Sequence, residues 1–370
     1  MKFTLPKSRL ANCLQSVLQV VPSKSTLPIL TNLLLEALDQ KLKISATDLD
    51  MSITGSVECD VIKKGSTALP ARILHDIVKE LPETDLTLES VNSRIELKIA
   101  NGSYKIASVS ADDFPKLPAI NTKKEIRVPA SDLANMIRKT SFACSMDETR
   151  PALNGVLWQT KGEKMQMVAT DGHRLAKAAV ENSRLKGMSE DIIVPPKVLN
   201  LIPKFIQDEK QEVGVIFGEN NIIFNLGTTV LTSRLIEGPY PNFEQVIPSD
   251  NDKAMRVSIG ELGGAVRRVA ILSNALTHQV KFGLKNSKLT LSTSNADLGG
   301  EGVESIECDF KGESVEIGYN ATYISEILNK IEGDEVVFEF SSPVSAGVMY
   351  SPEVSKDDYL CLVMPLRLAE

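Results

Sequence analysis

The sequence lacks the features that mark membrane proteins and secreted proteins. Its apolar residues occur in runs of only a few positions, so we expect no membrane-spanning segment. The first residues, Met1–Pro6, contain no apolar stretch of signal-peptide length. The five cysteines form no CxxC pair, which is typical of isolated thiols in a reducing compartment. We therefore expect a cytoplasmic protein without membrane contact.

Histidine is also scarce, and acidic residues outnumber basic ones. There are three histidines, and no cluster of His, Cys and carboxylate residues has metal-ligand spacing. The sequence contains no phosphate-binding loop and no nucleophile elbow. We therefore expect no metal, no cofactor and no catalytic residue. The net charge of −7 argues against a protein that binds nucleic acid by bulk charge.

One pattern is present three times along the chain. The segments Leu42–Asp48, Met165–Asp171 and Leu289–Asn295 resemble one another and lie 123 and 124 positions apart. A second set of landmarks recurs at a spacing of 125, namely Leu69, Ile73 and Ile77; Val194, Val198 and Ile202; Tyr319, Tyr323 and Ile327. A period of this length has the size of a whole domain. It predicts three similar domains in tandem, at residues 1–121, 122–250 and 251–370.

Each predicted domain contains two copies of a strand, a helix and further strands. Helices are expected from apolar residues at helical spacing, as in Arg9–Val17, and strands from alternation, as in Leu42–Ala46. Ser8 and Ser131 are placed as helix N-caps. Six helices over antiparallel sheets define an α+β fold class.

Basic residues are well represented on the predicted helices, whereas the acidic excess lies in strands and loops such as Glu301–Glu307. In a single helix, such lysines and arginines are ordinary solvated residues. If six equivalent half-units pack side by side, however, their helices form a basic stripe. A stripe of this kind suits a duplex held by its phosphates without base reading.

Several longer motifs carry a family resemblance. They are Thr26–Leu35, Ala111–Pro115, Ala169–Ala176, Ala270–Asn274 and Val363–Leu368. Together they resemble the bacterial DNA polymerase III β subunit family, the sliding clamps, along the whole chain. The resemblance implies a DNA clamp fold in which a head-to-tail homodimer forms a ring, with helices inside and antiparallel sheets outside. It implies a non-catalytic processivity subunit that encircles duplex DNA, is loaded by a clamp loader and tethers the replicative polymerase.

The resemblance also implies a groove between the second and third domains in which partners dock a short peptide. The expected partners are the DNA polymerase III α subunit, the clamp-loader δ subunit and other replication and repair proteins with a clamp-binding peptide. The matching positions are Leu153, Thr170, Gly172, His173, Arg174, Leu175, Pro241, Val246, Tyr323, Leu362, Met364, Pro365, Leu366 and Arg367. Gln245, where relatives can carry a basic residue, and the terminal Ala369-Glu370 leave the peptide preference open.

Part of this groove is expected to be structural. The Thr-Asp pair occurs in repeats one and two, which indicates a turn whose Asp accepts backbone N–H bonds. The segment Gly172–Leu175 belongs to repeat two alone, and a feature that breaks a repeat favours function. Ordinary core packing is the alternative for Leu153, Val246 and Leu362.

Two further surfaces follow from the resemblance. Contacts with duplex DNA map onto Lys24, Arg72, Arg150 and Lys197. The loop Arg150–Ala152 lacks the aromatic residues found in some relatives, which disfavours stacking on a single-stranded end. In the homodimer, Lys105 and Ile106 of one copy would meet Ile271 and Leu272 of the other, with core packing as the alternative for the apolar pair. A protein-only scaffold without DNA encirclement remains the competing interpretation.

Overall fold

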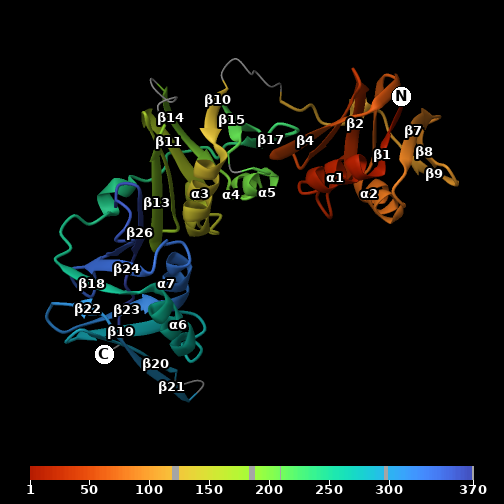
Figure 1. Ribbon diagram of the computed structural model, residues 1–370. Coiled ribbons are helices and arrows are strands. Elements are labelled where there is room, and N and C mark those ends of the chain that lie inside the picture. Colours follow the sequence, from red (N-terminus) through yellow and green to blue (C-terminus); the bar gives the residue numbers. More distant parts are fainter. Residues whose placement is uncertain (119–124, 183–187, 209, 296–298, 369–370) are drawn as a thin grey trace. The chain divides into compact units, whose positions relative to one another are not determined.

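The computed structural model describes residues 1–118, 125–182, 188–208, 210–295 and 299–368 (Figure 1). The chain forms two compact units. Unit 1 comprises residues 1–131 and 197–235, and unit 2 comprises residues 132–196 and 236–370. Both units draw on the expected second domain, because its two halves join different sheets. The predicted boundary at 121/122 and the terminal Ala369-Glu370 lie outside the described residues.

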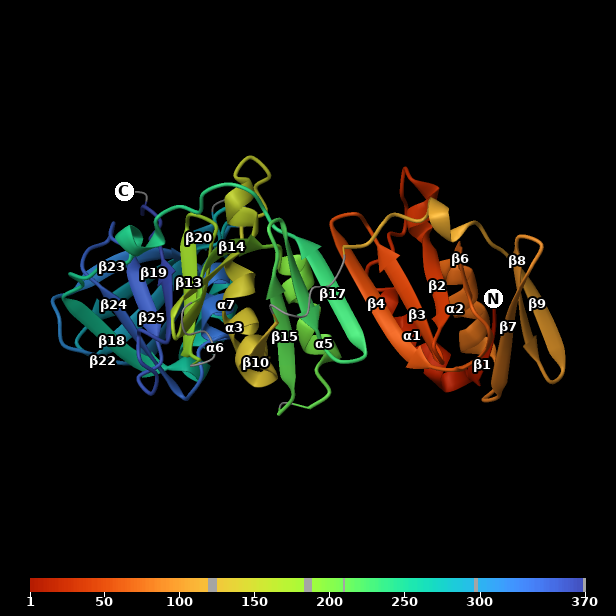
Figure 2. The same ribbon diagram turned by 90° about the horizontal axis from the view of Figure 1, so that it is seen from above.

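Unit 1 contains two antiparallel sheets. The first has the order β5-β1-β7-β8-β9 and the second the order β10-β15-β16-β17-β4-β3-β2-β6. The strands are β1 (Lys2–Pro6), β2 (Asn32–Leu38), β3 (Lys41–Thr47), β4 (Met51–Glu58), β5 (Asp60–Lys63), β6 (Gly65–Pro70), β7 (Asp85–Val91), β8 (Arg94–Ile99), β9 (Gly102–Ala107), β10 (Ile126–Pro129), β15 (Glu212–Phe217), β16 (Asn221–Asn225) and β17 (Thr229–Arg234). Figure 2 shows β17 beside β4, and the two strands pair from Thr229 with Gly55 to Ser233 with Met51.

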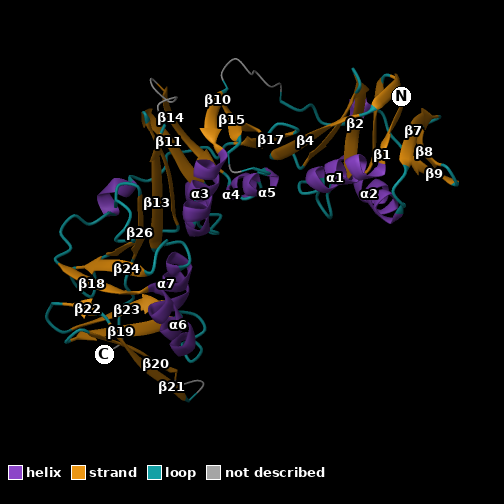
Figure 3. Cartoon of the chain, viewed as in Figure 1, coloured by secondary structure: helices purple, strands orange, loops and turns teal. Residues whose placement is uncertain are grey.

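The main helices of unit 1 are α1 (Lys7–Val17) and α2 (Ala71–Glu80), which contact each other. They lie on one side of the strands (Figure 3) and bury apolar residues such as Leu10 and Leu14 of α1. The predicted second helix of repeat two is interrupted. It forms α4 (Pro196–Leu199) and α5 (Ile202–Phe205), because Pro203 has no N–H to continue a helical ladder.

Unit 2 contains sheets with the orders β14-β11-β12-β13-β26-β25-β24-β18-β22 and β21-β20-β19-β23. The strands are β11 (Val156–Gly162), β12 (Lys164–Thr170), β13 (Arg174–Glu181), β14 (Met188–Val194), β18 (Lys253–Ser258), β19 (Gln279–Lys285), β20 (Lys288–Asn295), β21 (Gly300–Glu307), β22 (Asp309–Phe310), β23 (Val315–Asn320), β24 (Glu335–Phe340), β25 (Gly347–Tyr350) and β26 (Tyr359–Val363). The helices are α3 (Ala130–Thr140), of which Ala130 and Ser131 belong to unit 1, α6 (Ile259–Ala270) and α7 (Ala321–Leu328).

The described residues therefore contain seven α-helices rather than the six predicted. All strand pairs among them are antiparallel, so the predicted α+β class is confirmed. The two predicted N-caps are wrong. Helix α1 begins at Lys7, after Pro6, and α3 begins at Ala130, so Ser8 and Ser131 lie inside their helices. Ser258 and Asn320 are side-chain N-caps instead, of α6 and α7.

Candidate functional site

The turn between β12 and β13 is built from local hydrogen bonds. The Asp171 carboxylate accepts from the backbone N–H of His173 and of Arg174 at 2.8 and 2.9 Å. The Thr170 hydroxyl donates to the Arg174 carbonyl at 2.6 Å and accepts from the Gly172 N–H at 3.1 Å. Gly172 has φ +90°, a conformation that costs glycine little. The prediction of a structural Thr-Asp turn is confirmed.

Repeat one folds the same turn from a different sequence. Asp48 accepts from the N–H groups of Asp50 and Met51, and Thr47 donates to the Met51 carbonyl at 2.9 Å. The position equivalent to Gly172 is Leu49, with φ +80°. A leucine at positive φ is strained, because its Cβ approaches the backbone. The turn is thus maintained in both repeats, and only repeat two relieves the strain with glycine.

Arg174 is the centre of the charged contacts at this turn. Its Nε donates to Asp171 at 3.1 Å, one terminal nitrogen pairs with Glu326, and the other donates to the Phe142 carbonyl at 2.9 Å. The guanidinium carbon lies 4.5 Å from the ring centre of Tyr323. The residue is only 7% exposed. Its donors are therefore directed at the protein, and they join the turn to helix α7.

Strands β13 and β26 bring the C-terminal segment against this turn. Arg174 pairs with Val363 and Leu175 with Leu362 in the ladder. Just beyond it, the Met364 N–H donates to the His173 carbonyl at 2.8 Å. Residues about 190 positions apart thus form one surface. We call residues 170–175 together with residues 362–367 the docking surface.

The docking surface has polar and apolar groups accessible to a ligand. Of the predicted groove residues, Gly172, His173, Pro241 and Arg367 are exposed, and so are Val246 (54%) and Met364 (38%). The predicted groove residues that remain are buried or half-buried, namely Leu153, Thr170, Arg174, Leu175, Tyr323, Leu362, Pro365 and Leu366. The rings of His173 and Tyr323 are stacked with centres 6.5 Å apart. Met364 is therefore an exposed apolar residue of the docking surface that a ligand can contact.

An apolar cluster lies next to the docking surface. Its buried members are Leu157, Val168, Leu175, Ile193, Phe243, Val348, Leu360 and Leu362. Leu157, Ile193 and Phe243 also line a pocket of about 420 Å³, together with Tyr240 and Pro241. The cluster thus connects the docking surface to a pocket large enough for a side chain.

Titratable groups near the surface are suited to packing rather than to chemistry. Burial raises the pKa of the Cys144 and Cys361 thiols to about 12, so both are protonated at neutral pH. A thiol must lose its proton to act as a nucleophile. Burial, followed by the charge of Asp171, also raises the pKa of Tyr323. Among the described residues, no group of three or more His, Cys, Asp or Glu could hold a metal ion.

The predicted DNA contacts are exposed but differ in their surroundings. Lys24 and Arg72 are exposed, Arg72 near the start of α2. Lys197, at α4, pairs with Asp48, and Arg150 pairs with Asp147 at 2.9 Å. A Cβ at Gly172 would lie 2.9 Å from a terminal nitrogen of Arg150, so this guanidinium lies against the turn between β12 and β13.

The predicted dimer residues are not equally accessible. Lys105 is exposed in β9, but Ile106 is only 4% exposed. Ile271 is 75% exposed, whereas Leu272 is half-buried and lies 3.0 Å from the position of a Cβ on Gly300. Ile271 is therefore the apolar residue of this set that is free to meet another chain.

Sequence reasoning missed three residues that position Arg174. The repeated motif contains Asp171, but the repeat indicates only its role in the turn and not its contact with the Arg174 guanidinium. Glu326 is one helical turn beyond Tyr323, a spacing that places both on one face of α7 and could have indicated it. Phe142 contributes a carbonyl and a ring, and no sequence pattern indicates either contact.

Comparison with known families covers nearly the whole chain. Residues 1–118, 127–242 and 244–367 match the N-terminal, central and C-terminal domains of the DNA polymerase III beta subunit. The beta sliding clamp of Caulobacter vibrioides is 32% identical over 375 residues, covering 100% of both chains. That of Bacillus subtilis is 30% identical over 378 residues, covering 99% of this chain and 100% of the relative.

Solved structures agree with this match. The DNA polymerase III subunit beta of Pseudomonas aeruginosa superposes with a TM-score of 0.95 at 31% identity, covering 100% of both chains. A second crystal structure from that organism, of the sliding clamp bound to griselimycin, gives a TM-score of 0.94 over the same coverage.

Three tandem α+β domains with antiparallel sheets define the class of DNA clamps. The chain belongs to the DNA polymerase III beta subunit family. It is a sliding clamp, a non-catalytic processivity subunit. Within the described part of the chain, no helix is long and apolar enough to span a membrane.

Proposed function

We propose that this sliding clamp closes into a ring of two identical chains, encircles duplex DNA and docks replication proteins through short peptides. We take the three domains of each chain as residues 1–121, 122–250 and 251–370, so the ring of two chains contains six domains. The ring rests on one observation above all. Among the described strands, β9 is an edge of a sheet in unit 1 and β21 is an edge of a sheet in unit 2.

Edge strands expose backbone N–H and C=O groups that can pair with another chain. The two edges are unlike, because β9 carries Lys105 whereas β21 carries Glu301, Glu304 and Glu307. Two β21 edges would repel each other, so head-to-tail pairing of β9 with β21 is favoured. Such heterologous contacts close into a ring when the rotation between copies is half a turn.

For DNA, the exposed Lys24 and Arg72 support contact with phosphates. Lys197 and Arg150 each share their charge with a neighbouring acid, which weakens their attraction for phosphate. Weak and salt-screened contacts suit a clamp that must slide, because encirclement rather than affinity then provides persistence. We place the protein in the cytoplasm, where a bacterial chromosome is copied.

For partners, we propose that the polymerase α subunit, the clamp-loader δ subunit and other replication and repair proteins insert a peptide at the docking surface. The exposed Met364 and Val246 beside the apolar cluster support aliphatic or aromatic anchors. The expected affinity is modest, about micromolar, or roughly 8 kcal/mol. Modest affinity allows partners to exchange at one surface.

The test of encirclement is retention on DNA. The clamp, loaded by a clamp loader, is expected to stay on closed circular DNA and to be lost when the circle is cut. Equal retention on circular and linear DNA would refute encirclement. A protein-only scaffold would be retained on neither and would still bind the peptide.

The test of docking is calorimetry with an anchor-bearing peptide. Met364→Ala is expected to weaken binding roughly tenfold, while Ile62→Ala, an equally simple truncation of an exposed residue in unit 1, leaves it unchanged. A deletion variant for the same test should end after Met364. A chain that ends before Val363 would lose a residue that is fully buried in β26. Unaltered affinity in Met364→Ala would place the peptide elsewhere.

A further inference from the structure

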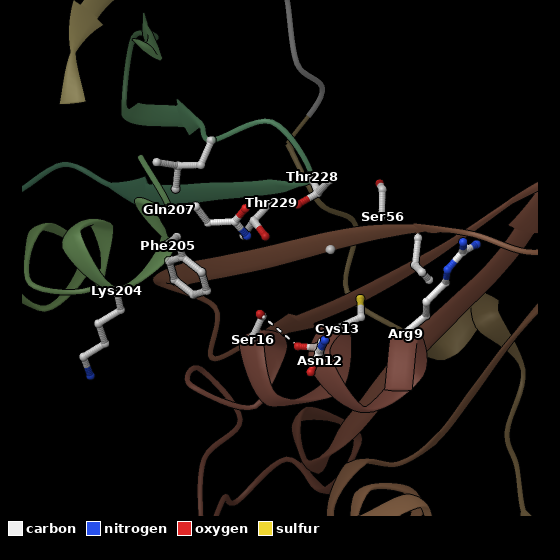
Figure 4. Close-up of a pocket in the computed structure, with 13 residues that line it drawn as sticks. Arg9, Asn12, Cys13, Ser16, Ser56, Lys204, Phe205, Gln207, Thr228 and Thr229 are labelled. Atoms are coloured by element: carbon white, nitrogen blue, oxygen red, sulfur yellow. Dashed lines mark hydrogen bonds between the residues drawn. The ribbon is translucent and has the colours of Figure 1, made fainter. Parts of the chain in front are cut away.

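A cleft in unit 1 lies apart from the docking surface. It is bounded by α1, by the paired strands β4 and β17, and by α5 with the residues that follow it (Figure 4). Its volume is about 310 Å³, near the lower end of the range for small-ligand sites. Gly55 of β4 allows α1 to approach closely, because a Cβ there would lie 2.6 Å from the Cys13 sulfur. We call it the α1–α5 cleft.

The charge of the α1–α5 cleft is positive. Arg9 and Lys204 line it, and Figure 4 shows them at opposite ends. Among the described residues that line the cleft, none is acidic. Neither cation forms an ion pair with a described carboxylate, in contrast to Arg150 and Lys197. Arg9 also borders a second pocket, which is lined by Asp39, Glu58, Asp60 and Asp85, without forming an ion pair among the described residues. Two cations without an ion pair can attract a ligand that carries negative charge at more than one point.

The space between the cations is lined by both polar and apolar side chains. Asn12 and Gln207 supply amides, and Ser56 and Thr228 supply hydroxyls that can donate to anionic oxygens. Phe205 is half-buried, and its ring lies between Lys204 and Ser16 in Figure 4. An aromatic ring beside amides and cations matches the stacking and charge requirements of single-stranded nucleic acid.

Cys13 does not provide a reactive group in this cleft. Burial raises the pKa of its thiol to about 12, so the sulfur is neutral and acts as part of the wall. The cleft is thus equipped for binding rather than for covalent chemistry.

We propose that the α1–α5 cleft binds nucleotide units, with phosphates at Arg9 and Lys204 and a base against Phe205. The same chemistry is offered by a free mononucleotide and by a single strand. The separation of the two cations to opposite ends favours the strand, which carries successive phosphates. A duplex does not fit this description, because its bases are already stacked on one another.

The test is fluorescence anisotropy of a labelled short oligothymidylate with the full-length protein. Phe205→Leu keeps an apolar side chain but removes the ring, and is expected to weaken binding at least about fivefold. Phe205→Tyr keeps the ring and is expected to restore it. Arg9→Ala and Lys204→Ala should each lower the salt slope by about 0.7. Arg256→Ala, the same change at an ion-paired residue in unit 2, is the matched control.

Two further arms identify the source of the ligand. If thymidine 5′-monophosphate displaces the labelled oligothymidylate at the same concentration as the unlabelled strand does, the cleft is a site for free nucleotides. If only the unlabelled strand displaces it, the cleft is a site for single strands. A labelled blunt duplex should bind equally to wild type and Phe205→Leu. The proposal is overturned if Phe205→Leu and the two charge variants bind the oligothymidylate as the control does, or if Phe205→Leu weakens the duplex equally. Either result leaves ring retention and peptide docking unaffected.

Discussion

Replacing Arg174 by alanine tests whether this residue positions the docking surface or contacts the peptide. The change removes a guanidinium that is 7% exposed and leaves the Asp171 carboxylate, itself 14% exposed, with its backbone N–H donors but without a cation. Breaking a buried pair from one side costs about 3–5 kcal/mol. Glu326 is 43% exposed, so the loss of that pair adds at most about 1 kcal/mol. We take about 3 kcal/mol as the expected loss.

The loss should appear in unit 2 alone, because every Arg174 contact described above is within it. For a unit of roughly 200 residues, about 3 kcal/mol lowers Tm by about 6–12 °C. The protein offers a local reporter. Trp158, its single tryptophan, is fully buried in β11 of unit 2. Urea unfolding followed by Trp158 fluorescence therefore measures the relevant transition.

The control is Arg138→Ala, which removes an arginine from the more exposed pair with Glu332 and should cost less than about 1 kcal/mol. Peptide affinity is measured on the same variants. If Arg174→Ala loses no more stability than Arg138→Ala and yet loses peptide binding, Arg174 is a ligand contact and the positioning argument fails. If stability falls as expected, Arg174→Lys should recover little of it, since a lysine cannot donate to the same three acceptors with the geometry of a guanidinium.

Three other variants give separate checks. Leu49→Gly should raise the stability of unit 1 by up to about 1 kcal/mol by relieving a φ of +80°, as measured by calorimetry; a loss would show that the turn tolerates leucine without strain. Burial raises the pKa of Glu332, but the hydrogen bonds and charges of Lys139 and Arg138 together outweigh it, so the pKa lies below its usual value of 4.5. The contribution of Glu332 to stability is therefore complete above pH 4.5 and is lost as pH falls through the lower pKa of the folded state. The stability gap between wild type and Glu332→Gln should therefore close in acid, and a constant gap contradicts the assignment. Ile271→Ala should weaken the dimer in light scattering without unfolding the chain, because Ile271 is 75% exposed; an unchanged dimer would exclude Ile271 from the interface.

The fold was largely predictable because its repeats are long and its strands alternate clearly. The strand expected at Leu42–Ala46 is β3, and the helix expected at Arg9–Val17 is α1. What the pattern could not supply was the pairing of β4 with β17 and of β13 with β26. These ladders join segments far apart in sequence, and periodicity contains no information about which edge meets which.

The docking surface was predicted less completely. Family resemblance placed residues of the turn and of the C-terminal segment together, and the structure brings His173 and Met364 into hydrogen-bond contact. Resemblance could not show that Arg174 is directed inward, since that depends on Glu326 and on a backbone carbonyl of Phe142. The assignments of individual DNA and dimer residues stay predictions.

The ladder between β4 and β17 has a consequence for the order in which the chain can fold during synthesis. Met51–Glu58 is made early, but its partner strand ends at Arg234, so the sheet that contains β4 and β17 is complete only after well over half of the chain has been made. Unit 2 waits longer still, because β13 pairs with β26 near the C-terminus. Until then β4 and β13 are open edges on a nascent chain, and open edges invite pairing with other chains. A fragment that ends at residue 121 would keep the β4 edge permanently exposed and is expected to self-associate.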